Sequence, residues 1–127
     1  MSLQAKYQKV LDLGAELGAK NGSVTEENGK LIITGTVATP YEKNLLWDEI
    51  KKIGGEAPSD LIADIRTETD AYYHKYTVVK GDTLGKISKH FYGEAGKYKQ
   101  IFDANRDILD NPDLIEIGQV LTIPFEK

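Results

Sequence analysis

The side chains that most often carry catalysis are scarce in this chain of 127 residues. It contains no cysteine and two histidines, His74 and His90, which excludes thiolate nucleophiles and cysteine-based metal sites. The serines beside charged residues, in Ser59-Asp60 and Ser88-Lys89-His90, do not complete a set of nucleophile, base and orienting group. The sequence therefore predicts a protein that is not an enzyme.

Two other groups of residues could bind a ligand without reacting with it. The turn Ile53-Gly54-Gly55-Glu56-Ala57-Pro58-Ser59 is rich in glycine, which lets backbone carbonyl oxygens face inward at low steric cost. A plain helix stop at Gly54-Gly55 is the alternative interpretation. Four carboxylates recur every three or four residues and could attract a cation, although a solvated helix face and loop explain them better: Asp103, Asp107, Asp110 and Asp113.

The composition is that of a folded globular protein, with 40% hydrophobic and 28% charged residues. A net charge of −4 argues against a nucleic-acid-binding protein, which would carry a basic face, and against an anionic membrane surface as partner. No apolar run approaches the ~20 residues of a membrane span. The amino-terminal residues lack the apolar stretch of a signal peptide, so we expect a cytoplasmic protein.

In the first half of the chain the elements are expected in the order helix, hairpin, helix, strand. Apolar residues at helical spacing end at Asn21-Gly22, and Asn28-Gly29 between two β-rich runs predicts a hairpin turn. A capping box with proline at the first helical position, Thr39-Pro40-Tyr41-Glu42, begins the second helix. A short strand is predicted over residues 61–65.

The second half begins and ends with a strand, at residues 75–79 and 118–124. Between them, two apolar stripes at helical spacing predict helices that begin near Leu84 and Tyr98. This order lets the two strands pair while both helices pack on one face. Because residues 67–74 show no steady period, we predict an α+β protein of two units, at residues 4–68 and 74–125, joined by a linker at residues 69–73.

The second unit resembles a LysM domain, a small carbohydrate-binding module of strand–helix–helix–strand order. The resemblance rests on segments that occur in the expected order: Tyr76-Thr77-Val78, Gly81-Asp82-Thr83-Leu84, Ile87-Ser88, Asn105, Asn111-Pro112-Asp113 and Gly118-Gln119-Val120-Leu121. It implies a shallow groove between two loops that binds N-acetylglucosamine polymers, such as peptidoglycan or chitin, largely through backbone groups. The groove residues that it implies are Gly81, Asp82, Thr83, Leu84, Ile108, Leu109, Asn111, Pro112 and Asp113. In the alternative interpretation, Asp82 and Thr83 cap a helix while Leu84 and Ile108 are core residues.

The first unit resembles a BON domain, through the glycine and apolar spacing of residues 29–37, the flanking helices and the third strand. A BON unit followed by a LysM unit resembles a family of small bacterial proteins that bind potassium. In that family the ion's donors come from an amino-terminal segment and from the turn after the second BON helix. This chain starts almost at the first BON helix, so the turn is the part that it matches. The potassium ligands implied by the resemblance are the backbone carbonyls of Ile53, Gly54, Gly55, Ala57 and Ser59.

Three hypotheses of function follow from these resemblances. The first is a cytoplasmic ligand-binding or sensor protein in which potassium orders the turn and changes how the two units dock. The second is a module that recognises N-acetylglucosamine polymers through the LysM groove, and the third is a protein–protein adaptor. Potassium is the one cofactor implied, and the expected partners are that ion or a glycan, with no nucleic acid and no membrane span.

Overall fold

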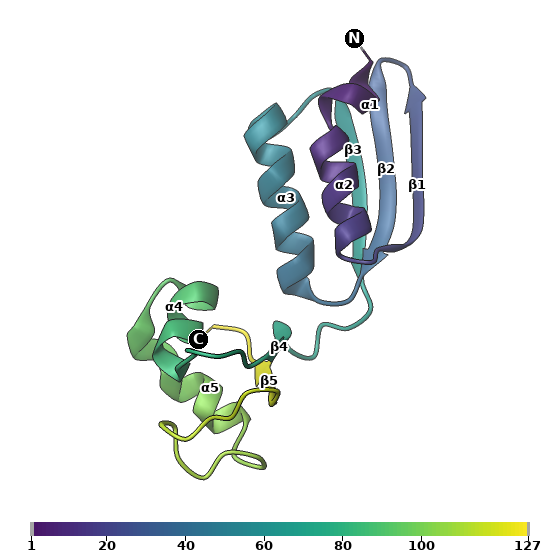
Figure 1. The fold of residues 1–127 in the computed structure, drawn as a ribbon. Helices are drawn as coiled ribbons and strands as arrows, with labels where there is room; N and C mark the ends of the chain where they lie inside the picture. Colours follow the sequence, from purple (N-terminus) through teal and green to yellow (C-terminus); the bar gives the residue numbers. More distant parts are fainter. Residues whose placement is uncertain (1, 127) are drawn as a thin grey trace. The chain divides into compact units, whose positions relative to one another are not determined.

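The computed structural model describes residues 2–126, and Figure 1 shows its helices and strands. The chain forms two compact units that divide between Asp70 and Ala71. Each unit contains helices and a sheet of its own, which confirms the predicted α+β class. Among the described residues, no helix is long and apolar enough to cross a membrane.

The first unit follows the predicted order of helix, hairpin, helix and strand, with a short additional helix at its start. Its elements are α1 (Leu3–Lys6), α2 (Gln8–Glu16), β1 (Lys20–Glu27), β2 (Lys30–Val37), α3 (Pro40–Gly54) and β3 (Leu61–Thr67). The break between α1 and α2 lies at Tyr7, whose backbone leaves helical geometry at φ −101° and ψ 19°. The assignment of this unit to the BON domain stays a prediction.

The sheet of the first unit has the strand order β1-β2-β3. β1 and β2 are antiparallel, and the turn between them contains Asn28 and Gly29, which take the positive φ values of 52° and 76° that the predicted hairpin requires. β3 runs parallel to β2, so α3 forms the crossover between them. α2 and α3 lie side by side on one face of this sheet (Figure 1).

The core of the first unit lies where these two helices meet the sheet. Its buried side chains are Tyr7, Val10, Leu31, Ile33, Val37, Leu46, Ile50, Leu61 and Ile65. The start of α3 has the predicted cap, because Thr39 Oγ1 accepts a hydrogen bond from Glu42 N at 3.4 Å. Helix α3 is therefore fixed at its first turn by its cap and along its length by the core.

The end of α2 differs from the prediction. The helix ends at Glu16, and Gly18 takes a left-handed φ of 74°, which is the usual way for a helix to end at glycine. The predicted stop, Asn21-Gly22, lies inside β1 instead, where Asn21 has a φ of 56° and the register with β2 shifts. The Asn-Gly pair thus forms an irregularity in a strand rather than a helix end.

The second unit has the predicted order of strand, helix, helix and strand. Its elements are β4 (His74–Thr77), α4 (Leu84–Tyr92), the short 3-10 helix η1 (Ala95–Lys97), α5 (Tyr98–Ala104) and β5 (Val120–Ile123). β4 and β5 pair as antiparallel strands. Tyr73, the last residue of the predicted linker, already belongs to this unit, because its backbone N donates to Ile123 O at 2.8 Å.

Asn105, one of the residues behind the LysM resemblance, is a buried structural residue with 2% of its surface exposed. Its Nδ2 donates to Ile101 O at 2.7 Å and to Thr122 O at 2.8 Å. Its Oδ1 accepts from Thr122 N at 2.8 Å. One side chain therefore connects the end of α5 to β5 and satisfies backbone groups that would otherwise be buried without partners.

Candidate functional site

The glycine turn, defined here as residues 53–59, leads from the end of α3 to β3 (Figure 1). Gly55 N donates to Lys51 O at 2.9 Å, which completes the last turn of the helix. Gly55 has φ 85° and ψ −178°, a region that residues with a side chain occupy at a cost of about 1–3 kcal/mol. The backbone shape of the turn therefore requires glycine at this position.

The predicted potassium ligands lie at the end of α3 and in the loop that follows it. The backbone oxygens of these ligands accept none of the hydrogen bonds described for residues 2–126. The ligands concerned are Ile53, Gly54, Gly55, Ala57 and Ser59. The last carbonyls of a helix have no intrahelical donor, and they carry the negative end of the helix dipole. The predicted ligands thus lie in one short, partly exposed loop at an electronegative helix end.

Three side chains from outside the turn hold its far end. Tyr7 Oη donates to Asp60 Oδ1 at 2.6 Å, and Lys6 Nζ lies 2.5 Å from Asp60 Oδ2. The hydrogen bonds from Lys6 and then from Tyr7 hold the pKa of the Asp60 carboxyl below its ordinary value. Burial, together with the neighbouring Asp60 carboxylate, raises the pKa of Tyr7 to about 12, so its hydroxyl stays protonated and keeps donating.

The near end of the turn packs against the same tyrosine. A methyl group placed on Gly54 would overlap the Tyr7 hydroxyl and would lie 2.8 Å from Pro58 Cβ. Gly54 is therefore required for close packing, whereas Gly55 is required for its backbone conformation. Sequence reasoning placed both glycines in the turn but did not find Tyr7, because nothing local in the sequence connects it to residues more than forty positions away.

One carboxylate lies within the turn and another directly follows it, and each lies near a lysine. Asp60 is paired with Lys6, and Glu56 Oε2 lies 3.8 Å from Lys51 Nζ. The turn thus offers neutral carbonyl oxygens beside charges that are already balanced. Such a donor set suits a large, weakly hydrated monovalent cation better than a divalent cation, which prefers carboxylates.

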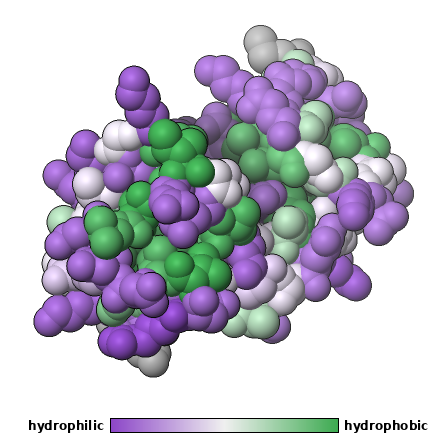
Figure 2. Space-filling model, turned by 60° about the horizontal axis from the view of Figure 1, so that its bottom comes forward, coloured by the Kyte–Doolittle hydropathy of each residue, from purple (hydrophilic) through white to green (hydrophobic). Residues whose placement is uncertain are grey.

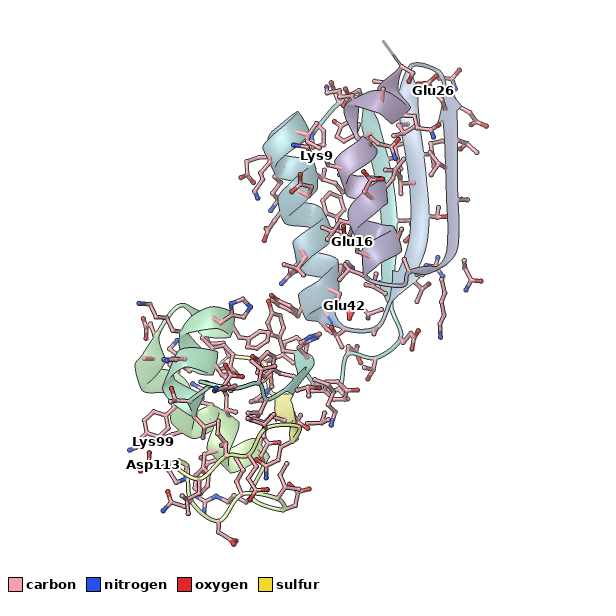
Figure 3. The ribbon with its side chains drawn as sticks, in the orientation of Figure 1. Lys9, Glu16, Glu26, Glu42, Lys99 and Asp113 are labelled. Atoms are coloured by element: carbon pink, nitrogen blue, oxygen red, sulfur yellow. The ribbon has the colours of Figure 1, made fainter. Side chains whose placement is uncertain are left out.

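The second candidate site is a groove of about 400 Å³ in the second unit. Its lining combines polar and apolar residues from the turn before α4, from the start of α4, from α5 and from the loop before β5: Asp82, Thr83, Leu84, Gly85, Tyr98, Pro112, Asp113 and Ile115. Asp113 lies on the loop that leads from α5 to β5 (Figure 3). The two loops named by the LysM resemblance therefore do face one another across a groove.

Asp82 and Thr83 have different structural roles at the edge of this groove. Thr83 is the cap of α4, since its Oγ1 accepts from Lys86 N at 3.1 Å. Asp82 is not the cap: its Oδ2 accepts from Tyr76 Oη at 2.7 Å and from Val79 N at 2.8 Å. These bonds fix the turn before α4, so the groove has a rigid wall on this side.

Four predicted groove residues lie outside the lining. Leu109 is 2% exposed and belongs to the core of the second unit, and Asn111 Oδ1 accepts from Asp113 N at 2.8 Å to shape its own loop. Ile108 is 45% exposed, and Gly81 O accepts from Lys86 Nζ at 3.1 Å. Leu84 does line the groove, but it is 2% exposed and is mainly a core residue.

Sequence reasoning missed three residues of the lining, Gly85, Tyr98 and Ile115. Tyr98 occupies the first position of α5, where its helical spacing indicated a core residue. Ile115 follows the predicted loop motif by two residues. The spacing of apolar residues does identify the helix, but it cannot show that one side of an aromatic ring faces a groove.

The aspartates that could have attracted a cation do not form a metal site. Among the described residues, no group of three or more His, Asp or Glu side chains is placed to hold a metal ion. Asp103 pairs with Arg106 at 2.8 Å on the exposed face of the unit. The interpretation as a solvated helix face and loop therefore explains these carboxylates better.

The second unit also exposes several large apolar side chains: Val79, Ile108, Leu114, Ile117 and Val120. Figure 2 shows one face of the molecule, on which apolar side chains gather in patches between polar ones. Patches of this kind occur at protein interfaces, but they also occur on monomeric proteins. They do not by themselves identify a partner.

Comparisons with known proteins bear on both units. The sequence profile of the LysM domain matches residues 76–124. The chain is 41% identical over 122 residues to the potassium binding protein Kbp of Escherichia coli O6:H1, and the match covers 95% of this chain and 80% of that protein. An uncharacterized protein of Deinococcus radiodurans is 32% identical over 120 residues, which cover 86% of this chain and 46% of that protein.

Shorter matches also occur, and one of them is with a LysM protein. The secreted LysM effector ECP6 of Passalora fulva is 52% identical over 50 residues, which are 39% of this chain and 20% of that protein. The similarity to Kbp, in contrast, runs through both units. The chain therefore belongs to the family of the potassium binding protein Kbp, and it carries a LysM domain.

Proposed function

We propose that this protein binds potassium at the glycine turn. The observation that supports this proposal is the set of five backbone carbonyls, from Ile53 to Ser59, that accept no hydrogen bond from the described residues. The 41% identity to a protein named for potassium binding supports the same ligand. The ion would be held by backbone oxygens, and no side chain would act as a catalyst.

The chemistry of the turn favours potassium over its competitors. Carbonyl oxygens replace the hydration shell of potassium at low cost, whereas sodium holds its water more tightly. The two nearest carboxylates, Glu56 and Asp60, are balanced by Lys51 and Lys6, so the turn offers no strong negative charge to calcium or magnesium. The negative end of the α3 dipole adds a weak attraction for any cation.

Isothermal titration calorimetry tests the proposal with potassium chloride and sodium chloride at matched ionic strength. Potassium should give a saturable signal and sodium a much weaker one. Carbonyl carbon NMR shifts then locate the ion: the signals of Gly54 and Gly55 should move with potassium, while those of Gly81 and Gly118 in the second unit serve as controls. Equal responses to the two salts would refute potassium binding, and shifts confined to the second unit would refute the location.

A second candidate function is glycan binding in the LysM groove. The groove of about 400 Å³ and the 52% identity to a LysM effector over 50 residues favour it. An acetamido group needs one donor and one acceptor, and the loops around Asp82 and Pro112 can supply backbone groups of both kinds. Titration with chitooligosaccharides should shift the amide signals of Gly85 and Tyr98, and unchanged spectra would exclude this function.

A further inference from the structure

The Tyr7 hydroxyl touches both ends of the glycine turn. At the near end it lies against Gly54, and at the far end it donates to Asp60 Oδ1 at 2.6 Å. The backbone of Asp60 is also fixed, because its carbonyl accepts from Leu31 N at 2.8 Å in the sheet. One hydroxyl group therefore spans the base of the loop that carries the predicted potassium ligands.

The hydroxyl can be separated from the rest of the tyrosine. The Tyr7 side chain is fully buried among the core residues of the first unit, so its ring stabilises the fold by itself. The hydroxyl, in contrast, lies against Gly54 and donates to Asp60 Oδ1. Removing the oxygen while keeping the ring would therefore change the turn more than the core.

We propose that the Tyr7 hydroxyl and the Asp60 carboxylate are positioning residues of the potassium site, which hold the two ends of the glycine turn at a fixed separation. This inference rests on the proposed potassium function. Carbonyl oxygens bind an ion well when their arrangement exists before the ion arrives, since the entropy of ordering the loop is then already lost. Lys6 neutralises Asp60, so the carboxylate positions the turn and does not itself take the cation.

The test compares three substitutions by potassium titration at a temperature where circular dichroism shows each variant to be folded. Tyr7→Phe and Asp60→Ala each remove one side of the bond and should weaken potassium affinity about tenfold, as expected for the loss of one hydrogen bond. Asp60→Asn should recover most of the affinity that Asp60→Ala loses, because an amide oxygen can still accept the Tyr7 proton. In Tyr7→Phe and Asp60→Ala, the ratio of potassium affinity to sodium affinity should fall together with the potassium affinity. Such a fall would show that the arrangement of the carbonyl oxygens has loosened.

The second unit provides a matched control. Tyr76 Oη donates to Asp82 Oδ2 at 2.7 Å, the same kind of bond in a part of the chain without predicted potassium ligands. Tyr76→Phe should therefore leave the potassium affinity unchanged. If Tyr76→Phe weakens binding as much as Tyr7→Phe, or if Tyr7→Phe and Asp60→Ala bind potassium like the wild type, the positioning role is overturned while potassium binding stands. If the wild type itself does not prefer potassium, the proposed function fails first.

Discussion

Replacing Gly54 with alanine should destabilise the first unit because of one steric overlap. The added methyl group would overlap the Tyr7 hydroxyl and lie 2.8 Å from Pro58 Cβ, which overpacks the site at a cost of about 1–3 kcal/mol. Displacing the hydroxyl from Asp60 would add about 1 kcal/mol, and the higher helix propensity of alanine would return up to about 1 kcal/mol. We expect a net loss of about 2 kcal/mol in the free energy of unfolding.

The cause of this loss can be isolated with Tyr7→Phe. Without the hydroxyl, the nearest ring atom would be Cζ at 3.3 Å from the new methyl group, which is still a close contact but no longer an overlap, and the 2.8 Å approach to Pro58 Cβ would remain. Gly54→Ala should therefore be less damaging by about 1 kcal/mol when it is combined with Tyr7→Phe, a coupling that a double-mutant cycle detects. Trp47, the single tryptophan of the chain, packs against the first core, so its fluorescence during urea unfolding reports on this unit. An equal loss with and without the tyrosine hydroxyl would refute the steric explanation.

Three further predictions concern stability. Gly55→Ala should lower the free energy of unfolding by about 1–3 kcal/mol in the same urea assay. Backbone strain alone causes this loss, since no atom lies within 4 Å of the added methyl group. An unchanged free energy of unfolding would contradict the φ of 85° at Gly55. Asn105→Ala should cost the second unit about 3 kcal/mol, because the buried backbone groups of Ile101 and Thr122 lose their partner; calorimetric melting checks this. Burial first, and then Glu68, raises the pKa of Glu42, so the folded state binds this proton more tightly than the unfolded state does. Glu42→Gln should therefore raise the melting temperature at pH 7. This gain should disappear as the pH falls through the pKa of Glu42. A melting temperature that stays higher than that of the wild type in acid would contradict this account.

Features fixed by neighbouring residues could be predicted from the sequence. Asn28 and Gly29 predict a hairpin because both positions of the turn need a positive φ, and both have one. Thr39 and Glu42 predict a helix start, since a cap needs only residues three positions apart, and the cap is present. Asn21-Gly22 misled for the same local reason: the pair permits a positive φ, but this occurs in a strand irregularity as well as at a helix end.

Features that depend on distant residues could not be predicted. The bond from Tyr7 to Asp60 joins residues 53 positions apart, and its existence depends on how Tyr7, between α1 and α2, comes to lie beside the loop that leads from α3 to β3. In the groove, the sequence located both loops but assigned the core residue Leu109 to the lining. Tyr98 does pack against the core, as its spacing indicated, but the sequence did not show that it also lines the groove. A side chain's distance from a groove depends on the packing of the whole unit, and the period of a helix shows only which residues share a face.

Melting of the first unit in potassium and in sodium tests the central claim most directly. A ligand that binds only the folded state stabilises it by RT ln(1 + [L]/Kd), which is about 2.7 kcal/mol at a hundred times Kd. Unfolding followed by Trp47 fluorescence should therefore shift to higher temperature as potassium chloride replaces sodium chloride at constant total salt. Identical unfolding curves in the two salts would contradict a potassium site in the glycine turn.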